Sequence, residues 1–381
     1  MRVAIAPDKF AGTLSAVEAA QAIADGWRRT SPHDDLACIP IADGGPGFID
    51  VIHATCGGHL LSVAVTGPLG DATPATVLLV DDVAGITAYV ESAQAAGLHL
   101  VPIDKRDPGV TTTYGVGELI AAAVDAGATK IVIGLGGSAT NDGGAGLLAA
   151  LGATALRESE PAPQAMSNGG AALISLDSVD VEPARHRVAH VDLVAATDVD
   201  NPLLGIRGAT AGFGPQKGAD DAQVVTLDAA LEHFSKLIGR RADGKDPAIA
   251  LGAGAAGGMG YALLAVGATR ASGIDTVLDA IDLGAHIATA DVVITGEGSF
   301  DWQSLRGKAV TGVALRATEH ARPCIVLAGR VALGRREFAA AGVTEAFSVE
   351  DNAGSLQAAL AHPAEALAAL AERVARTWSR Q

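Results

Sequence analysis

The feature that most constrains the fold is a pattern repeated at both ends of the chain. A short apolar run rich in β-branched residues stops at a polar or glycine turn, and a helical segment follows. Near the start, such runs cover residues 2–6 and 36–41, and the helix between them begins at Ser15 with Glu18 three residues on, a capping box. Near the end, we predict three more strands and three helices: strands at 291–295, 323–328 and 346–349, and helices at 308–320, 335–341 and 362–378.

Five strands that alternate with helices predict an α/β fold, a flavodoxin-like doubly wound parallel sheet of order 2-1-3-4-5. The middle of the chain would be a second α/β domain, inserted between the second and third strands. The predicted domains are residues 1–60 with 286–381, and residues 61–285. The inserted part has extended runs of its own, at 62–65, 75–80, 85–90, 131–134 and 192–196. The polar segment 157–170 is predicted to be a surface loop.

Composition excludes several classes of protein. Hydrophobic residues make up 49% of the 381 residues, enough for a sizeable core. The net charge of −16 disfavours a nucleic-acid partner, which needs a basic surface. Three cysteines without a CxxC pair provide neither a disulfide framework nor a zinc site. No secretory signal or membrane-spanning run is recognisable, so we expect a cytoplasmic protein, a monomer or homodimer, with no membrane partner.

Polar residues gather where the predicted outer strands end. Asp8 and Lys9 follow the first strand, Asp43 follows the second, and Glu297 follows the third with Asp301 shortly after. Ligands of doubly wound sheets bind at the carboxyl ends of the strands, where the winding direction switches. One lysine, several carboxylates and tight glycine turns suit phosphoryl transfer. The alternative is that these are ordinary polar residues that cap helices.

The segment 134–144, GLGGSATNDGG, follows an apolar strand and precedes an apolar helix, which is the layout of an anion cradle. It has no lysine after its glycines, so it is not a Walker A motif. We expect Gly136, Gly137, Ser138 and Thr140 to hold nucleotide phosphates. Asn141 could cap the helix and Asp142 could bind Mg²⁺. The alternative is a glycine turn in which Asp142 is the helix cap.

Two more segments are candidates for binding. Residues 252–260, GAGAAGGMG, satisfy GxGxxG, but no convincing strand precedes them, so a dinucleotide fingerprint is a weak interpretation. A loop in which Gly254, Gly257 and Gly258 approach phosphates is more plausible. Asp198 follows the apolar run 192–196 beside a second acidic residue and Asn201, and could bind a metal. An Asn-Pro turn is the alternative there.

Taken together, these segments resemble the bacterial type of the glycerate kinase family. Ten motifs match in the family's order along almost the whole chain. They are APDKFAGTLSA (6–16), ADGGPG (42–47), TGPLG (66–70), KRDP (105–108), GVGELI (115–120), GLGGSATNDGGAG (134–146), DVDNPLLG (198–205), FGPQKGA (213–219), GAGAAGGMG (252–260) and ITGEGSFDWQSLRGK (294–308).

The resemblance implies transfer of the γ-phosphate of ATP to D-glycerate, with Mg²⁺, and leans to the 2-hydroxyl. Lys9 would neutralise the transferring phosphoryl group or bind the glycerate carboxylate. Asp301 or Glu297 would be the general base or a metal ligand, with Asp8 beside them in the catalytic group. Substrate contacts are expected from four residues of the matched motifs, namely Asp43, Arg106, Gln303 and Lys308.

The sequence also departs from the family. Pro46 stands where the family usually has Glu, which removes a carboxylate beside the expected site. Two alternatives therefore stay open: a kinase for another small hydroxy acid or sugar acid, and a nucleotide-binding protein without turnover. An oxidoreductase that binds a dinucleotide is a third, weakened by the missing strand before residue 252.

Overall fold

The computed structural model describes the chain from residue 1 to 379, except residues 11, 159, 163, 242 and 306–308. The chain divides into two compact units. The first unit contains Met1–Asp43, Asp50–Gly57 and Ile274–Gln381, and the second contains Gly44–Ile49 and Gly58–Gly273. Each unit is described by itself below.

The sheet of the first unit is parallel throughout, with the order β16-β14-β12-β1-β2. Counted along this unit alone, that order is 2-1-3-4-5, so the predicted flavodoxin-like topology is confirmed. The strands are β1 (Arg2–Pro7), β2 (Asp35–Cys38), β12 (Val292–Gly296), β14 (Cys324–Ala328) and β16 (Glu345–Ser348); β13 (Ser299–Phe300) and β15 (Arg330–Val331) form a separate small pair.

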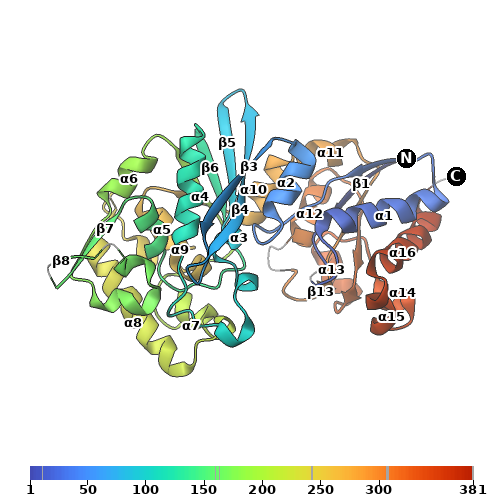
Figure 1. The fold of residues 1–381 in the computed structure, drawn as a ribbon. Helices are drawn as coiled ribbons and strands as arrows, with labels where there is room; N and C mark the ends of the chain where they lie inside the picture. The colour runs from blue at the N-terminus through green and yellow to red at the C-terminus, as the bar shows by residue number, and fades with distance from the viewer. Residues whose placement is uncertain (11, 159, 163, 242, 306–308, 380–381) are drawn as a thin grey trace. The chain divides into compact units, whose positions relative to one another are not determined.

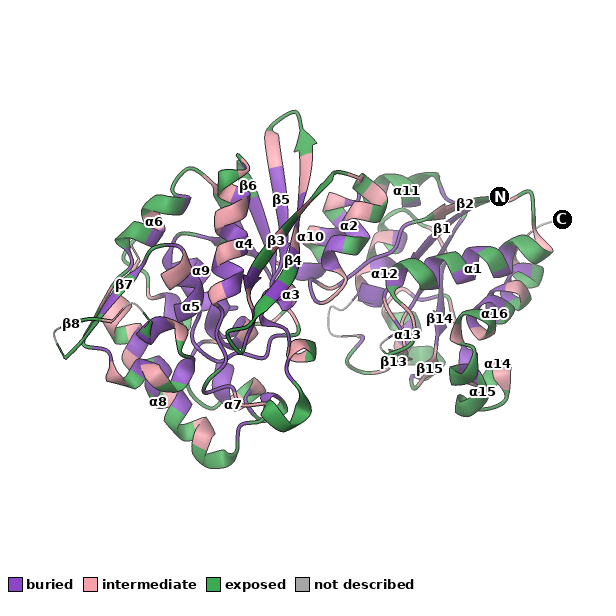
Figure 2. Cartoon of the chain, in the orientation of Figure 1, coloured by how far each residue is buried: buried purple, intermediate pink, exposed green. Residues whose placement is uncertain are grey.

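Helices α1 (Ala16–Thr30) and α16 (Pro363–Trp378) lie side by side (Figure 1). Their apolar residues pack with Val3, Ile5 and Ile294 in one buried cluster, and Figure 2 shows the strands and the inner faces of these helices as buried. The predicted capping box is present, because Ser15 Oγ accepts from the Glu18 N–H. The other helices are α2 (Phe48–Cys56), α10 (Gly273–Ala280), α11 (Leu283–Thr289), α12 (Ala309–Glu319), α13 (Arg335–Ala340), α14 (Val349–Ala353) and α15 (Leu356–Ala361).

The second strand is shorter than predicted. It ends at Cys38, because Pro40 has no N–H to continue the ladder. The chain nevertheless stays beside β1, since the N–H groups of Ile39 and Ile41 donate to the carbonyls of Ile5 and Pro7 at 2.7 and 3.0 Å. The sequence also missed α14 and α15, two short helices of five and six residues.

The second unit is built on a mixed sheet of order β11-β10-β6-β5-β4-β3. Strands β3, β4 and β5 form an antiparallel meander, and β5, β6, β10 and β11 run parallel. The five predicted strands are all present. The bounds are β3 (His59–Thr66), β4 (Ala72–Asp82), β5 (Gly85–Glu91), β6 (Lys130–Gly134), β10 (Asp192–Ala196) and β11 (Thr269–Ala271).

Helices of the second unit share one large apolar cluster with this sheet, built mostly from Ala, Val, Leu and Ile. Phe234 and Tyr261 meet edge to face within it, at 6.3 Å between ring centroids. The helices are α3 (Ala93–Ala96), α4 (Tyr114–Asp125), α5 (Ala145–Ala150), α6 (Glu182–Val188), α7 (Ala209–Phe213), α8 (Asp221–Ile238) and α9 (Met259–Ala265).

The prediction of a plain surface loop over 157–170 was wrong. A three-stranded sheet of order β8-β7-β9 covers part of this region, and a 3₁₀ turn, Ala165–Ser167, follows it. Ala165 and Met166 are buried in the core, which explains why the turn is fixed. The strands are β7 (Thr154–Arg157), β8 (Glu160–Pro161) and β9 (Ser178–Asp180).

The close approach of α1 and α16 supplies a test of the packing. A Cβ on Gly26 would overlap the backbone of Ala368, whereas a Cβ on Gly284, in α11, would meet nothing nearer than 3.8 Å. We expect Gly26→Ala to lower the free energy of unfolding by about 1–3 kcal/mol, because the helices must separate. Gly284→Ala is the matched control, expected to be neutral or to stabilise by up to about 1 kcal/mol. Urea unfolding followed by circular dichroism measures both; equal effects would contradict the packing argument.

Candidate active site

The carboxyl ends of β1 and β12 bring two predicted catalytic carboxylates to one edge of the first-unit sheet. The strands pair in parallel with Pro7 opposite Gly296, so Asp8 and Glu297 are the next residues on each. The Asp8 N–H donates to the Gly296 carbonyl at 2.8 Å, which extends the pairing by one residue. Asp8 is buried, and its Oδ1 accepts from the Lys9 N–H at 2.7 Å.

Lys9 and Asp43 meet at the same edge. The hydrogen bond from Ile41 to Pro7 holds the segment after β2 beside the end of β1. Lys9 Nζ lies 4.0 Å from Asp43 Oδ1, and the two side chains are 31% and 39% exposed. A half-exposed pair of this kind adds little to stability. It orients the ammonium group while leaving it accessible to an anion.

Asp301 lies in a turn just after β13. Its Oδ1 accepts from the Gln303 N–H at 2.8 Å and its Oδ2 accepts from Ser299 Oγ at 3.3 Å. Its own N–H donates to the buried Ser304 Oγ at 3.1 Å. The carboxylate is therefore fixed by its own turn. The predicted substrate contact Lys308 lies outside the described residues.

In the second unit, the glycine-rich segment 134–144 surrounds a buried lysine that the sequence did not single out. Lys217 is 3% exposed, and its Nζ donates to Ser138 Oγ at 2.9 Å and to the Thr140 carbonyl at 2.7 Å. Burial lowers the pKa of Lys217 to about 7, against the opposing effect of Asp142. Lys217 belongs to the matched motif FGPQKGA, but only its burial distinguishes it from a surface lysine.

Asp142 caps the start of α5 with its side chain, from two residues before the N-cap residue Gly144. Its two carboxylate oxygens accept from the Thr113 N–H and Oγ1 and from the N–H groups of Gly144 and Gly146, at 2.8–3.3 Å. Burial raises the pKa of this carboxyl, against those hydrogen bonds. Of the two interpretations of Asp142, this geometry favours the cap, and we do not assign it a metal.

Two polar atoms of the same segment point to a missing partner. Thr140 Oγ1 and Asn141 Oδ1 are buried, and neither has a hydrogen-bond partner among the described residues. Asn141 Nδ2 donates to Thr210 Oγ1 at 2.9 Å. Arg106, a predicted substrate contact, has a buried Nε that is likewise unpartnered within the described chain, and its backbone lies against Gly218, next to Lys217. Buried polar atoms without partners are rare and suggest water or a ligand.

The predicted phosphate glycines have protein neighbours. A Cβ on Gly257 would overlap the Thr140 carbonyl, and one on Gly258 would lie 2.6 Å from Gly143 Cα. A Cβ on Gly254 would overlap the Pro202 carbonyl. These glycines are thus needed where the segment 252–260 packs, backbone to backbone, on neighbouring loops.

Gly136 and Gly137 also lie where a side chain would collide with a neighbouring loop. A Cβ on Gly136 would lie 2.5 Å from Gly45 Cα, and one on Gly137 would lie 3.0 Å from Pro46 Cγ. Pro46, the departure from the family pattern, therefore packs directly on the glycine-rich segment.

Asp198 lies at the carboxyl end of β10. Its Oδ1 accepts from Ser272 Oγ and the Gly273 N–H at 2.8 and 2.9 Å. The neighbouring Asp200 pairs with Arg270 at 2.5 Å. Within the described residues, no group of three or more His, Cys, Asp or Glu side chains is arranged to hold a metal ion. A cation here would depend on one carboxylate and on ligand oxygens.

The first unit is a doubly wound α/β unit with a lysine and carboxylates at its carboxyl edge, and the second has a glycine-rich loop; these are groups of the kind that phosphotransferases use. The model of the glycerate kinase family matches residues 3–379. The chain belongs to the glycerate kinase family. No helix among the described residues is long and apolar enough to cross a membrane.

Individual relatives agree along nearly the full length. The chain is 44% identical over 377 residues to the glycerate kinase of Bacillus subtilis strain 168, covering 99% of this chain and 96% of that protein. It is 43% identical over 360 residues to the glycerate 2-kinase of Escherichia coli K12, covering 94% and 93%. A crystal structure from Salmonella typhimurium LT2, of a protein assigned as glycerate kinase 2, has a TM-score of 0.83 at 41% identity, covering 99% and 98%.

The buried Lys217 predicts a pH-dependent contribution to stability. Its pKa is about 7 in the folded protein against an ordinary value of 10.5, so between these values the unfolded chain binds a proton that the folded chain lacks. The penalty for burying the charge is therefore full below pH 7 and is relieved as pH rises toward 10.5. We expect the unfolding free energy of the wild type, minus that of Lys217→Met, to increase with pH by up to about 1.4 kcal/mol per unit.

Urea denaturation at pH 7, 8 and 9 measures this difference. Lys130→Met, at an exposed position at the start of β6, is the control and should give a difference that does not change with pH. A pH-independent difference for Lys217→Met would mean that Lys217 keeps its proton in the fold.

Proposed function

We propose that this protein transfers the γ-phosphoryl group of ATP to the 2-hydroxyl of D-glycerate. Membership of the glycerate kinase family supports the reaction class, and the Escherichia coli relative named glycerate 2-kinase supports the position. The observation that carries the proposal is the edge where β1 and β12 end, which gathers Asp8, Lys9, Asp43 and Glu297. We also propose that the enzyme acts in the cytoplasm, as a monomer or homodimer.

Lys9 has the charge and the exposure to interact with an anion. In the proposed reaction its ammonium group neutralises the phosphoryl group in transfer or binds the glycerate carboxylate. The glycerate hydroxyl oxygen forms a bond to the γ-phosphorus, the bond to the bridging oxygen of ADP breaks, and the hydroxyl proton passes to a carboxylate. Asp301 and Glu297 are the proposed bases, and the bonds that hold Asp301 in its turn would keep its carboxylate oriented.

The carboxylates at this edge also fit Mg²⁺, which prefers oxygen ligands and usually takes one or two carboxylates together with substrate phosphates. Asp8 or Glu297 would hold it together with substrate phosphates, since no group of three acidic side chains among the described residues is arranged as a metal site, and Asp198 is a further candidate in the second unit. When bound, Mg²⁺ supplies charge neutralisation on the phosphates.

The nucleotide phosphates are proposed to bind the segment 134–144, where Ser138 provides a hydroxyl and Lys217 an amino group that is positively charged when protonated. The unpartnered Thr140 Oγ1 and Asn141 Oδ1 lie in the same segment. The segment 252–260 supports this loop by packing on it, and that is the role we assign to Gly257 and Gly258.

The assay that tests the proposal is ADP release from Mg²⁺-ATP with and without D-glycerate, followed by phosphorus NMR of the product. Glycerate-dependent release of ADP and a 2-phosphoglycerate signal are expected. Rates of ADP release with a panel of small hydroxy acids show whether another acceptor is preferred. That alternative stays open because Pro46, which replaces the family's usual Glu, lies beside Gly137. ATP binding without ADP release would indicate a protein without turnover and would overturn the proposal.

Substitutions at the edge separate the proposed roles. Asp301→Asn or Glu297→Gln, whichever removes the base, should lower kcat by about 10²–10⁴-fold. Lys9→Met should lower kcat/KM by about 10²–10³-fold, comparable to the loss of one preorganised donor. Lys130→Met, an exposed lysine at the start of β6 and outside the matched motifs, is the control and should change neither. Unchanged kcat in both carboxylate variants, with the fold intact, would remove both residues from the base assignment.

A further inference from the structure

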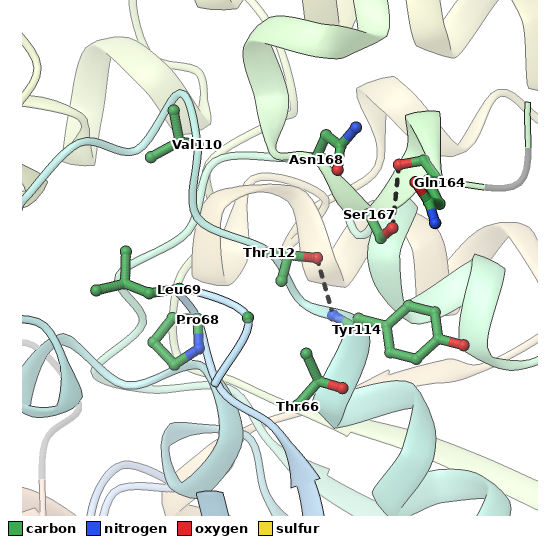
Figure 3. A pocket seen from close by; sticks show the side chains of 10 residues that line it. Thr66, Pro68, Leu69, Val110, Thr112, Tyr114, Gln164, Ser167 and Asn168 are labelled. Atoms are coloured by element: carbon green, nitrogen blue, oxygen red, sulfur yellow. Dashed lines mark hydrogen bonds between the residues drawn. The ribbon is translucent and has the colours of Figure 1, made fainter. Parts of the chain in front are cut away.

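One cavity of the second unit is lined by residues to which no binding role has been assigned so far. It has a volume of about 710 Å³ and is lined by three segments of the chain (Figure 3). The lining residues are Thr66, Pro68, Leu69, Gly70, Val110, Thr112, Tyr114, Gln164, Ser167 and Asn168. Its volume falls in the range typical of small-molecule sites, about 300–1,000 Å³.

The chemistry of this lining is neutral. Among its residues there is no Asp, Glu, Lys, Arg or His. A phosphate or a carboxylate would find no charged partner here, so neither the glycerate carboxylate nor the ATP phosphates match the cavity. A neutral ligand with hydrogen-bonding edges does match it.

Two side-chain amides are available to such a ligand. Gln164 and Asn168 flank the 3₁₀ turn Ala165–Ser167, one at each end, and Figure 3 shows both beside the cavity. Among the described residues, neither amide takes part in a hydrogen bond, whereas Ser167 Oγ donates to the Gln164 carbonyl at 3.0 Å. An amide of this kind can donate to one atom and accept from its neighbour, the pairing by which Asn and Gln recognise the N6 and N7 atoms of adenine.

Apolar groups supply the complementary surface. Leu69 and Val110 are 40% and 52% exposed, and Pro68 lies beside Leu69 in the same wall (Figure 3). The Tyr114 ring forms part of the wall on another side. A planar heterocycle can cover such surface with its faces while its edge meets the amides.

A single segment, residues 110–114, lies between the cavity and the proposed phosphate loop and contacts both. Along residues 110–114, Val110, Thr112 and Tyr114 line the cavity. The alternate residues bond to the glycine-rich segment: Thr111 Oγ1 donates to the Ala139 carbonyl at 3.0 Å, and Thr113 Oγ1 donates to Asp142 at 2.8 Å. A single short stretch of chain therefore connects a neutral cavity with the loop that has the anion-binding groups.

We propose that this cavity binds the nucleoside part of ATP, with Gln164 and Asn168 at the adenine edge. The proposal rests on the proposed function for the identity of the nucleotide. It adds a base-recognition site formed by segments 66–70, 110–114 and 164–168, and it makes Gln164 and Asn168 the residues that select ATP over GTP.

The first experiment measures binding, so it does not require turnover. Adenosine, which has no phosphates, is titrated into wild-type protein and into the double variant Gln164→Met/Asn168→Leu by calorimetry. Both substitutions keep the side-chain size and remove the amides. We expect wild type to bind adenosine in competition with ATP and the double variant to bind it at least about tenfold more weakly, the lower part of the range for a bidentate base contact.

The kinetic counterpart separates base recognition from chemistry. In the double variant the KM for ATP should rise about tenfold and the preference for ATP over GTP should fall by a similar factor, with kcat and the KM for D-glycerate little changed. Gln357→Met, an exposed position on α15, is the matched control and should behave as wild type. An unchanged KM for ATP together with unchanged adenosine binding would overturn the proposal.

Photolabelling with 8-azidoadenosine locates the site directly. The label is expected on peptides that contain residues 110–114 or 164–168. The first unit has a competing cavity of about 300 Å³, lined mainly by aliphatic side chains that include Leu356 and Leu360, and labelling there would overturn the proposal. Adenosine that competes with D-glycerate but not with ATP would assign the neutral cavity to the acceptor and would also overturn it. Absence of glycerate-dependent ADP release, with adenosine still bound at the cavity, would refute the proposed function and leave the nucleoside site standing.

Discussion

The parallel pairing of β1 with β12 is the interaction on which the proposed catalytic edge depends. It joins two parts of the chain almost 290 residues apart, with Val3 opposite Val292 and Pro7 opposite Gly296. Apart from Arg2 at the start of β1, both strands are buried on both faces, so a shift of one residue would misplace close-packed side chains on each side of the sheet. Asp8 and Glu297 emerge together only in this register, so the chemistry of the edge is a consequence of core packing in the first unit.

A different constraint shapes the second unit, where glycines let backbones approach one another. Gly257 and Gly258 meet the chain at 140–143, and Gly136 and Gly137 meet Gly45 and Pro46. The segment 134–144 is thus held between two other loops and by the four hydrogen bonds that Asp142 accepts. A loop held in this way keeps one conformation, so a ligand that contacts it would not have to order this part of the chain first.

The sequence predicted the strands and the polar residues at their ends because both are local signals. Buried β-branched runs and glycine turns identified all five strands of the first unit, and strand order then located Asp8, Lys9 and Asp43. Burial of polar side chains has no local signal. Lys217 lies in a matched motif but was given no role, and the sequence left Asp142 open between a helix cap and a Mg²⁺ ligand; only the packed structure reveals that both side chains are buried. The 164–168 turn was interpreted as a surface loop for the same reason, since its core contacts, Ala165 and Met166, lie between polar neighbours.

In the second unit, two charged side chains are buried at the glycine-rich loop, whereas the cavity near that loop is lined by no charged side chain. Among the described residues, Lys217 is the only buried lysine or arginine, and the glycine-rich loop that surrounds it contains the fully buried Asp142. Burying two charges costs free energy that an apolar core would not, so stability alone does not account for them. The segment 110–114 connects this loop to the cavity, whose lining has polar side chains but no charged ones. A ligand with an anionic end and a neutral, hydrogen-bonding end accounts for both features at once, and a nucleotide has that distribution.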